Sequence, residues 1–384
     1  MRLKNHLPPC NRHQSAHIAP MKIAFYAPLK SPNHPVPSGD RLMARLLLRA
    51  LILAGHEVEI ASELRSFHAS PDVVLPDLQV SATAEVTRLA ALYQDQGRPD
   101  IWFCYHPYYK APDLIGPLLC QQFGMAYVTA EASYSHRRNL GVWTDFQAQL
   151  LDHVKTAALN LCFTARDFLG LEAVAPNAHL ARLAPFIDAA PFVSCAPLPQ
   201  PGVLATVAMM RPGDKMSSYT ALAQALTKLG DGPWRLRVVG DGPCRDEVQA
   251  LFSHFAPGQI EWLGEQPPER VAEILSTASL YVWPGHGEAY GLAYLEAQAA
   301  GLPVVAEAVA GVPEVVAAGI TGLLAPPGDA DALAASVAEL LNNGALRGTM
   351  AVAARARVKM HHGLEAASER LSILLQEALE KHHV

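Results

Sequence analysis

The chain has 384 residues, of which 50% are hydrophobic and 17% are charged. This composition suits two folded domains, each large enough to bury its own core, and excludes a chain that is disordered throughout. The formal net charge of −6 argues against a dedicated nucleic-acid binder, which needs a basic surface to displace counterions. No apolar run approaches the length of a transmembrane helix. The six cysteines form no CxxC pair and are expected to be free thiols in a reducing cytosol.

Residues 1–20 differ in character from the rest of the chain. They are polar, rich in histidine and proline, and lack hydrophobic periodicity. Met21 then opens an apolar run typical of a strand, so either Met21 is the true start or residues 1–20 form a disordered extension. The histidines of this segment are loosely spaced and lack acidic neighbours, which favours an ordinary tail over a metal site.

The first half of the chain alternates short apolar runs with amphipathic segments. Apolar residues at helical spacing follow Ser38 and continue to about Gly55, and a second helical segment spans 81–97. The expected strands are 22–27, 57–61, 100–105 and 125–130. Strands separated by helices of this length give right-handed parallel crossovers, which predicts a doubly wound sheet.

Proline is concentrated between residues 184 and 202, where it cannot continue a helix or a central strand. The alternation of strands and helices then restarts and continues to a last amphipathic helix. We therefore predict an α/β protein of two Rossmann-like doubly wound domains that face each other across a cleft, with ligands at the carboxyl ends of the strands. The predicted parts are a first domain at 21–195, a linker at 196–202, a second domain at 203–360 and a helix at 361–384.

The segment 283–316 holds the strongest candidate site. A predicted strand ends at Pro284, glycines make the following loop flexible, and a helix starts near Gly291. The free amides of a helix N-terminus bind anions, so a diphosphate fits there. Glu288 and Glu296 flank this N-terminus, and their carboxylates can accept hydrogen bonds from the hydroxyls of a sugar and a ribose. The spacing of the two glutamates alone is more typical of a solvated helix face.

The residues around these glutamates resemble the signature of the family-4 retaining glycosyltransferases of the GT-B fold, E-x-(F/Y)-G-(L/M)-x-x-x-E-A-x-A-x-G-x-P-V-(V/I). The matching residues are Glu288, Tyr290, Gly291, Leu292, Glu296, Ala297, Ala299, Gly301, Pro303, Val304 and Val305. The resemblance implies that Glu288 contacts the donor sugar and that Glu296 binds the ribose. It places Tyr290, Gly291 and Leu292 in the donor site, with the backbone there on the diphosphate. It also implies a final helix that crosses back to the first domain.

Two further segments of the second half resemble the same family. In 209–226, Arg211 and Lys215 match a pair of cations that neutralise the leaving diphosphate, which gains negative charge as the glycosidic bond breaks. Without the resemblance, they are two surface cations in a loop. In 238–251, Gly240 belongs to a V-G-x-G-P turn that resembles part of the donor site.

The V-G-x-G-P turn also half-matches the dinucleotide-binding pattern GxGxxG, but the third position holds Arg245, so we discount a dehydrogenase. Asp329 and Asp331 spell DxD, which holds a metal in another glycosyltransferase fold. Here they precede an apolar helix, and N-capping is the expected role. We expect neither a metal site nor a cofactor, because Arg211, Lys215 and the helix dipole already supply positive charge.

Loop residues after the predicted strands of the first domain complete the candidate site. Gly39 resembles the first-loop glycine that lets the chain approach the transferred sugar and phosphate. His106 follows the third strand and could exchange a proton or bind a hydroxyl, although an ordinary loop histidine is almost as good an interpretation. Many family members carry a histidine that contacts the sugar just after the fourth strand. In this chain Glu131 and His136 are the alternatives for that role.

Arg41, Arg45 and Arg49 form a basic stripe along the first predicted helix. A solvated helix face is the simpler interpretation of this stripe. Docking on an anionic membrane surface is the alternative, which some relatives with lipid acceptors use.

The predicted activity is transfer of a sugar from a UDP- or GDP-sugar to a hydroxyl of a glycan, a lipid-linked sugar or a small molecule, with retention of anomeric configuration. We expect a cytoplasmic protein, with peripheral contact at the inner face of the membrane as an option. One alternative is a sugar-nucleotide-binding pseudoenzyme, suggested by the missing first-domain histidine. Another is a GT-B UDP-sugar epimerase, which the Glu288 and Glu296 pattern does not support. The base, the sugar, the acceptor and the oligomeric state stay open.

Overall fold

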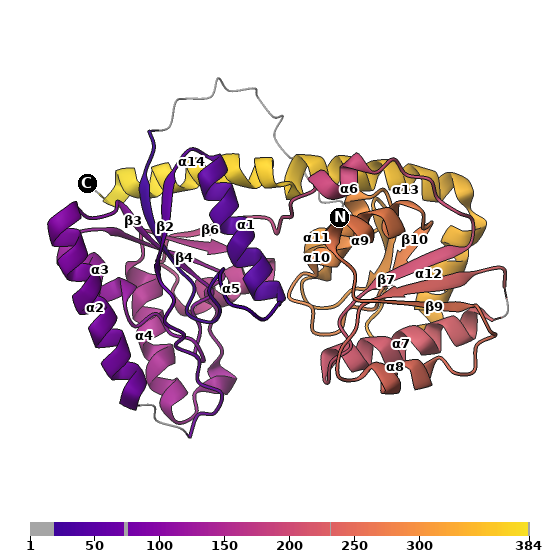
Figure 1. Ribbon diagram of the computed structural model, residues 1–384, viewed down its shortest axis with the longest axis horizontal. Coiled ribbons are helices and arrows are strands. Elements are labelled where there is room, and N and C mark those ends of the chain that lie inside the picture. Colours follow the sequence, from indigo (N-terminus) through magenta and orange to yellow (C-terminus); the bar gives the residue numbers. More distant parts are fainter. Residues whose placement is uncertain (1–18, 73–75, 231, 383–384) are drawn as a thin grey trace, which may run out of the picture.

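The computed structural model describes residues 19–72, 76–230 and 232–382. It contains two six-stranded parallel sheets, each flanked by helices, that lie side by side (Figure 1). The strand order is β2-β1-β3-β4-β5-β6 in the first sheet and β12-β11-β10-β7-β8-β9 in the second. The predicted fold of two doubly wound domains is confirmed.

The first sheet begins the chain, and its inner strands are buried on both faces because helices cover both sides. Its strands are β1 (Lys22–Tyr26), β2 (Glu57–Ser62), β3 (Ile101–Tyr105), β4 (Ala126–Ala130), β5 (Leu159–Cys162) and β6 (Leu180–Arg182). Its helices are α1 (Gly39–Leu53), α2 (Pro76–Gln96), α3 (Gly116–Phe123), α4 (Val142–Thr156) and α5 (Ala165–Val174). The Ser38 side chain caps α1 by accepting a hydrogen bond from the amide of Arg41.

The second sheet repeats this architecture. Its strands are β7 (Val203–Val207), β8 (Arg235–Val239), β9 (Ile260–Gly264), β10 (Leu280–Val282), β11 (Val304–Glu307) and β12 (Gly322–Ala325). Its helices are α7 (Asp214–Leu229), α8 (Arg245–Leu251), α9 (Pro268–Ser276), α10 (Leu292–Ala299), α11 (Val312–Val315), α12 (Ala330–Asn342) and α13 (Gly344–Arg357). Helix α7 begins at Asp214, which places Lys215 in its first turn.

The chain passes between the two domains twice. The first crossing follows β6, and the short helix α6 (Ala190–Ser194) already packs against α9 and α10. Within the predicted linker at 196–202, the Leu198 amide donates to the Ser276 carbonyl of α9 at 2.8 Å, so this segment lies on the second domain. The second crossing is a π-helical turn at Val358–His362, whose His362 carbonyl accepts from the Ile187 amide at 2.9 Å.

The final helix α14 (Leu364–His382) runs back across the first domain and packs along α1 (Figure 1). Leu371 and Leu375 of α14 are fully buried, and the Ser372 hydroxyl lies 3.3 Å from Nε2 of the buried His56. The expected return of the last helix to the first domain is therefore confirmed.

Several expectations concern the ends of the chain and its exposed faces. The extension predicted at residues 1–20 lies outside the described residues, apart from the exposed Ala19 and Pro20. In the described part of the chain, no helix combines the length and apolarity that crossing a bilayer requires. Cysteines at five positions there are free thiols.

The arginine stripe of α1 is held within the first domain. The Arg41 and Arg45 guanidinium groups donate to carbonyls of the loop 32–35 at 2.7–3.0 Å. Arg49 pairs with Asp188 of the first crossing at 2.8 Å. All three side chains therefore bond to the neighbouring loop or to the first crossing between the domains.

We expect Leu371→Ala to lower the free energy of unfolding by about 2–5 kcal/mol, because it leaves a cavity between α14 and α1. Ile373 lies on the same helix with 37% of its surface exposed, and Ile373→Ala should cost no more than about 0.5 kcal/mol. Urea unfolding followed by circular dichroism measures both. Equal losses in the two variants would contradict the docking of α14.

Candidate active site

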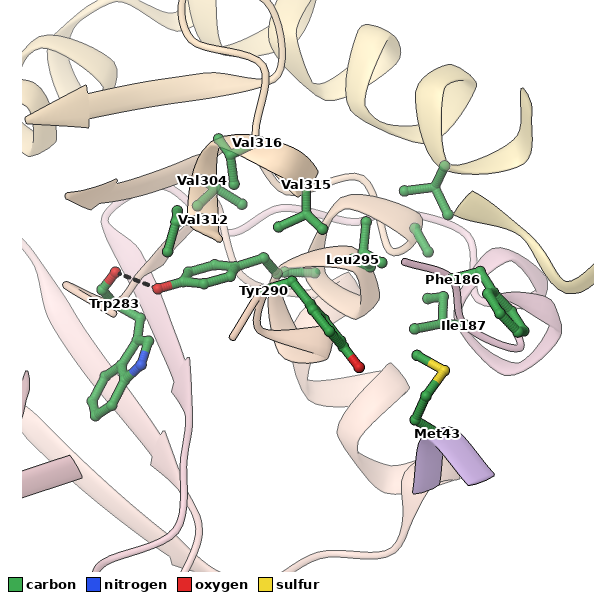
Figure 2. Close-up of a cluster of buried hydrophobic side chains, with 14 of the residues drawn as sticks. Met43, Phe186, Ile187, Trp283, Tyr290, Leu295, Val304, Val312, Val315 and Val316 are labelled. Atoms are coloured by element: carbon green, nitrogen blue, oxygen red, sulfur yellow. Dashed lines mark hydrogen bonds between the residues drawn. The ribbon is translucent and has the colours of Figure 1, made fainter. Parts of the chain in front are cut away.

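A cleft of about 830 Å³ lies between the carboxyl edges of the two sheets. All the candidate site residues predicted from the sequence line it, with the exception of His136. The two domains also share one buried hydrophobic cluster beneath the cleft, to which Met43 of α1, Ile187 of the first crossing and Tyr290 all belong (Figure 2). The cleft is therefore built on a continuous core.

Lys215 and Glu288 form an ion pair in the second-domain wall of the cleft. Lys215 comes from the first turn of α7, and Glu288 from the loop after β10. Trp283, just past the end of β10, donates its indole N–H to the same Glu288 oxygen, Oε1, at 3.1 Å. The Lys215 ammonium also lies 5.5 Å from the centroid of the Trp283 ring, within reach of a cation–π interaction. Among the described residues nothing bonds to the second oxygen of Glu288, Oε2, which a ligand can use.

The N-terminus of α10 opens into the cleft beside Glu288. Gly291 caps this helix with a φ of 77°, and a Cβ at this position would lie 2.6 Å from the Tyr294 ring. Only glycine fits that conformation and that space. Gly291 and Leu292 at the start of this helix line the cleft, where the free amides of a helix N-terminus can bind an anion.

Glu296 lies one turn inside α10 and lines the same cleft. Its carboxyl is in an apolar setting, and this burial raises its pKa from 4.5 to about 7. The pKa of the nearby Tyr281 rises mainly through burial, and the charges of Glu288 and Glu296 raise it further. The two glutamates therefore share one wall of the cleft, on either side of the helix N-terminus.

Glycines after β8 bring the chain close to the segment that carries Arg211. A Cβ at Gly240 would lie 1.9 Å from the Ala208 carbonyl oxygen, and one at Gly242 would lie 2.2 Å from that of Met210. Arg211 follows directly, is exposed and lines the cleft. Within the described residues no carboxylate lies within 4.0 Å of the Arg211 guanidinium. Its charge is therefore available to a ligand.

His106 and Glu131 are the first residues after β3 and β4, and both adopt left-handed backbone conformations with φ of 58° and 59°. Non-glycine residues rarely take this conformation, which concentrates at functional sites. The turn aims both side chains into the cleft. The His106 amide donates to the Ala130 carbonyl at 2.8 Å, so the neighbouring strand holds the strained residue in place.

His106 forms a dyad with Asp40, which lies in the first turn of α1 next to the predicted Gly39. Nδ1 of His106 is 3.1 Å from Oδ1 of Asp40. Burial lowers the pKa of His106, but the bond to Asp40 and the negative charge of Glu131 outweigh it and raise the pKa overall. Burial likewise opposes ionisation of Asp40, while the bond to His106 brings the pKa of this carboxyl below its usual value. Among the described residues, His106 bonds through Nδ1, and no hydrogen bond joins its Nε2 to another side chain.

Glu131 reaches the second domain. Tyr290 donates its hydroxyl to Oε2 of Glu131 at 3.4 Å. Figure 2 shows the Tyr290 ring beside Leu295 and directed toward Met43 of the first domain. Burial raises the pKa of the Glu131 carboxyl, and the charge of His106 opposes that shift. Glu131 thus links the two domains at the floor of the cleft.

His136, the other candidate for the missing histidine, lies away from the cleft. It is exposed in a short 3-10 turn, and its Nδ1 is 3.2 Å from the Tyr134 hydroxyl. Of the two alternatives, the structure brings only Glu131 to the other site residues.

Asp40 and Trp283 are site residues that the sequence patterns did not single out. Trp283 lies at the end of a predicted apolar strand, beside the loop that carries Glu288. This position could have marked it as a candidate site residue. Asp40 follows the predicted Gly39, but its bond to His106 joins residues that are far apart in the sequence.

Asp329 caps α12 by accepting a hydrogen bond from the Ala332 amide at 2.9 Å, as expected. Asp331 pairs with Lys228 of α7 on the surface. In the portions of the chain that the structure covers, no three His, Cys, Asp or Glu side chains gather closely enough to hold a metal ion.

Comparison with solved structures identifies the architecture. The chain superposes on a sucrose-phosphate synthase from Thermosynechococcus elongatus with a TM-score of 0.72 at 21% identity, covering 94% of this chain and 100% of that one. Two parallel six-stranded domains that face each other across a cleft define the GT-B fold, and this chain has that fold.

Most of the second domain also matches a named protein family. Residues 205–357 match the family Glycosyl transferases group 1. A GDP-mannose-dependent monoacylated alpha-(1-6)-phosphatidylinositol monomannoside mannosyltransferase of Corynebacterium glutamicum is 32% identical over 167 residues, which is 42% of this chain and 43% of that protein. An exopolysaccharide phosphotransferase of Streptomyces coelicolor, SCO2592, is 42% identical over 131 residues, which is 32% of this chain and 13% of that protein. These matches span less than half the length of either relative.

The raised pKa of Glu296 makes stability depend on pH. A carboxyl with a higher pKa in the folded chain binds more protons when folded, so the free energy of unfolding falls as pH rises from 4.5 to about 7. We expect Glu296→Gln to remove this loss, so that its urea midpoint falls less than that of the wild type between about pH 5 and about pH 8. The exposed Glu339→Gln serves as the control and should follow the wild type. An identical fall in the Glu296 variant would contradict the burial of this carboxyl.

Proposed function

We propose that the protein is a retaining glycosyltransferase that moves a sugar from a UDP- or GDP-sugar to a hydroxyl acceptor. The observation that carries the proposal is the convergence of Arg211, the Lys215–Glu288 pair and the N-terminus of α10 in one cleft of a GT-B fold. Fixed cations and helix amides bind a diphosphate, and carboxylates on either side bind the sugar and the ribose. The second domain's family and the mannosyltransferase relative support the same chemistry.

The reaction breaks the bond between the anomeric carbon and the diphosphate oxygen. The electron pair goes to that oxygen, and the negative charge it brings is stabilised by Arg211, Lys215 and the amides near Gly291. The acceptor oxygen bonds to the anomeric carbon from the face that the diphosphate leaves, and its proton passes to the leaving phosphate. Attack on this face retains the anomeric configuration without requiring a protein base.

The Lys215–Glu288 pair joins the two halves of the donor site. An ammonium group has three donor hydrogens, so Lys215 can keep Glu288 and still donate to a phosphate oxygen. The free Oε2 of Glu288 then accepts from a sugar hydroxyl. Positive charge from this chain's own residues makes a metal unnecessary in the proposed reaction.

His106 and Glu131 complete the site from the first domain. Nε2 of His106 is placed to bind a hydroxyl of the sugar or of the acceptor, with Asp40 holding the ring in one orientation. Glu131 is bonded to Tyr290 and is thus placed to couple sugar binding to the approach of the two domains. A sugar-nucleotide binder without activity is the second candidate, because Glu131 stands where many family members have histidine.

We expect Lys215→Ala and Glu288→Ala each to lower the rate of transfer by about 10²–10³-fold, because each removes a group that stabilises the leaving group or orients the donor. Lys228→Ala is a matched control, since Lys228 lies on the same helix and pairs with the exposed Asp331. Release of the nucleoside diphosphate measures the rate, and circular dichroism checks folding. Wild-type turnover in either cleft variant would exclude this assignment of the donor site.

We expect one of UDP, GDP or ADP to raise the melting temperature by several degrees, because a ligand at a hundred times its Kd stabilises the folded state by about 2.7 kcal/mol. Slow release of free nucleoside diphosphate from the matching nucleotide sugar, without acceptor, then identifies a transferase. Binding with no release under any acceptor tried would identify the inactive binder. NMR of the product reports whether the anomeric configuration is retained.

A further inference from the structure

Glu307 is a buried carboxylate that the proposed reaction does not use. It ends strand β11 and is 1% exposed. Its Oε2 accepts a hydrogen bond from the Gly328 amide at 2.8 Å and lies 3.1 Å from Nε2 of His286. Because an ionised carboxylate can only accept, the His286 ring donates from Nε2. Among the described residues the other oxygen, Oε1, is buried without a hydrogen-bond partner, and His286 is the one side chain that bonds this carboxylate.

His286 belongs to the loop between β10 and α10. Its ring reaches β11 through the bond just described, whereas its main chain reaches α7, because the His286 amide donates to the Ser218 hydroxyl at 2.9 Å. Ser218 is fully buried, and its hydroxyl donates in turn to the Asp214 carbonyl at 2.9 Å. Asp214 begins α7 and directly precedes Lys215. His286 therefore ties the loop to the helix that carries Lys215 and, on the other side, to the neighbouring strand.

Glycines on both sides of His286 leave this loop little conformational preference of its own. Gly285 and Gly287 have positive φ angles of 92° and 65°. A Cβ at Gly287 would lie 2.1 Å from Oδ2 of Asp214, so the loop passes directly against the start of α7. His286 is the only residue of 285–287 with a side chain, and its ring is therefore the group that can select one conformation of the loop tip.

The placement of Glu288 depends on this loop. The Glu307 amide donates to the Pro284 carbonyl at 3.0 Å and fixes one end of the loop. The Gly311 amide donates to the Glu288 carbonyl at 3.4 Å and fixes the other. The Glu288 carboxylate lies two residues after His286, lines the cleft and pairs with the ammonium group of α7. A change at the loop tip would move this carboxylate, and a misplacement of about 1 Å can lower a rate about 10²-fold.

We infer that His286 and Glu307 form a positioning pair, which fixes the loop between β10 and α10 so that the Glu288 carboxylate meets the donor sugar. This inference rests on the proposed glycosyltransferase function and adds two positioning residues to the same site. Neither His286 nor Glu307 lines the cleft, so both act through Glu288. Glu307 holds the His286 ring, and the ring holds the loop.

Turnover and nucleotide affinity together separate positioning from a general loss of structure. We expect His286→Ala to lower kcat, measured by release of nucleoside diphosphate, by about 10²-fold. Its Kd for the nucleoside diphosphate should stay within about threefold of the wild type. The reason is that Arg211, Lys215 and the helix amides are proposed to bind the diphosphate, whereas Glu288 is proposed to contact the sugar. His286→Gln should recover most of kcat, because the glutamine amide can donate to Glu307.

A second variant guards against misfolding. His286→Ala leaves the buried Glu307 carboxylate with one hydrogen bond among the described residues, which can destabilise the chain. His286→Ala/Glu307→Ala removes the carboxylate as well, and we expect it to fold by circular dichroism and to show the same low kcat. His254→Ala is the matched control and should keep the wild-type kcat. His254 is exposed and bonds the Thr227 hydroxyl at 2.8 Å, near the far end of α7.

A spectroscopic signal tests the loop without any substrate. The Trp283 indole N–H donates to Glu288, so its NMR signal reports where that carboxylate lies. We expect this signal, assigned with Trp283→Phe, to move in His286→Ala and in His286→Ala/Glu307→Ala but not in His254→Ala.

Wild-type kcat or an unchanged Trp283 signal in the folded double variant would overturn the inference. So would a loss of nucleoside diphosphate affinity as large as the loss of kcat, which would indicate general damage to the donor site. The proposed transferase function fails separately, through wild-type turnover in Lys215→Ala or through the absence of nucleotide binding. In that case the Trp283 signal still tests whether His286 and Glu307 hold the loop.

Discussion

Parallel strands deliver the residues that follow them to a single edge of their sheet, and in this chain two such edges face each other. That constraint brings Glu288, which follows β10, into one cleft with His106 and Glu131, which follow β3 and β4. The glycines after β8 serve the same end by letting the chain approach the backbone that leads to Arg211. The site therefore depends on the two edges meeting, more than on any one motif.

Holding the edges together requires contacts that belong to neither domain alone. The buried cluster continues from Met43 of the first domain to Tyr290 of the second (Figure 2). Tyr290 also bonds Glu131, and α14 returns to α1 after the π-helical turn of the second crossing (Figure 1). Both domains contribute to these contacts, which hold the two sheet edges on either side of the cleft.

Backbone strain and charge are both concentrated at this cleft. The left-handed conformations of His106 and Glu131 cost about 1–3 kcal/mol each and persist because strand ladders and side-chain bonds hold them. The Lys215–Glu288 pair lies in the second-domain wall of the cleft, and the His106–Asp40 pair lies in the first-domain wall. Each wall of the cleft therefore holds one close pair of acidic and basic side chains.

Local patterns in the sequence were enough to predict the class of fold and most of the residues that line the second-domain wall of the cleft. Periodicity placed the strands, and the spacing from Glu288 to Glu296 around a glycine-started helix lies within one segment of chain. Three contacts became visible only in the folded chain: Asp40 bonds His106, Glu131 meets Tyr290, and Arg65 bonds the Leu29 carbonyl. Each of these contacts joins residues from different loops, and their meeting depends on strand order and domain approach, which no local pattern encodes.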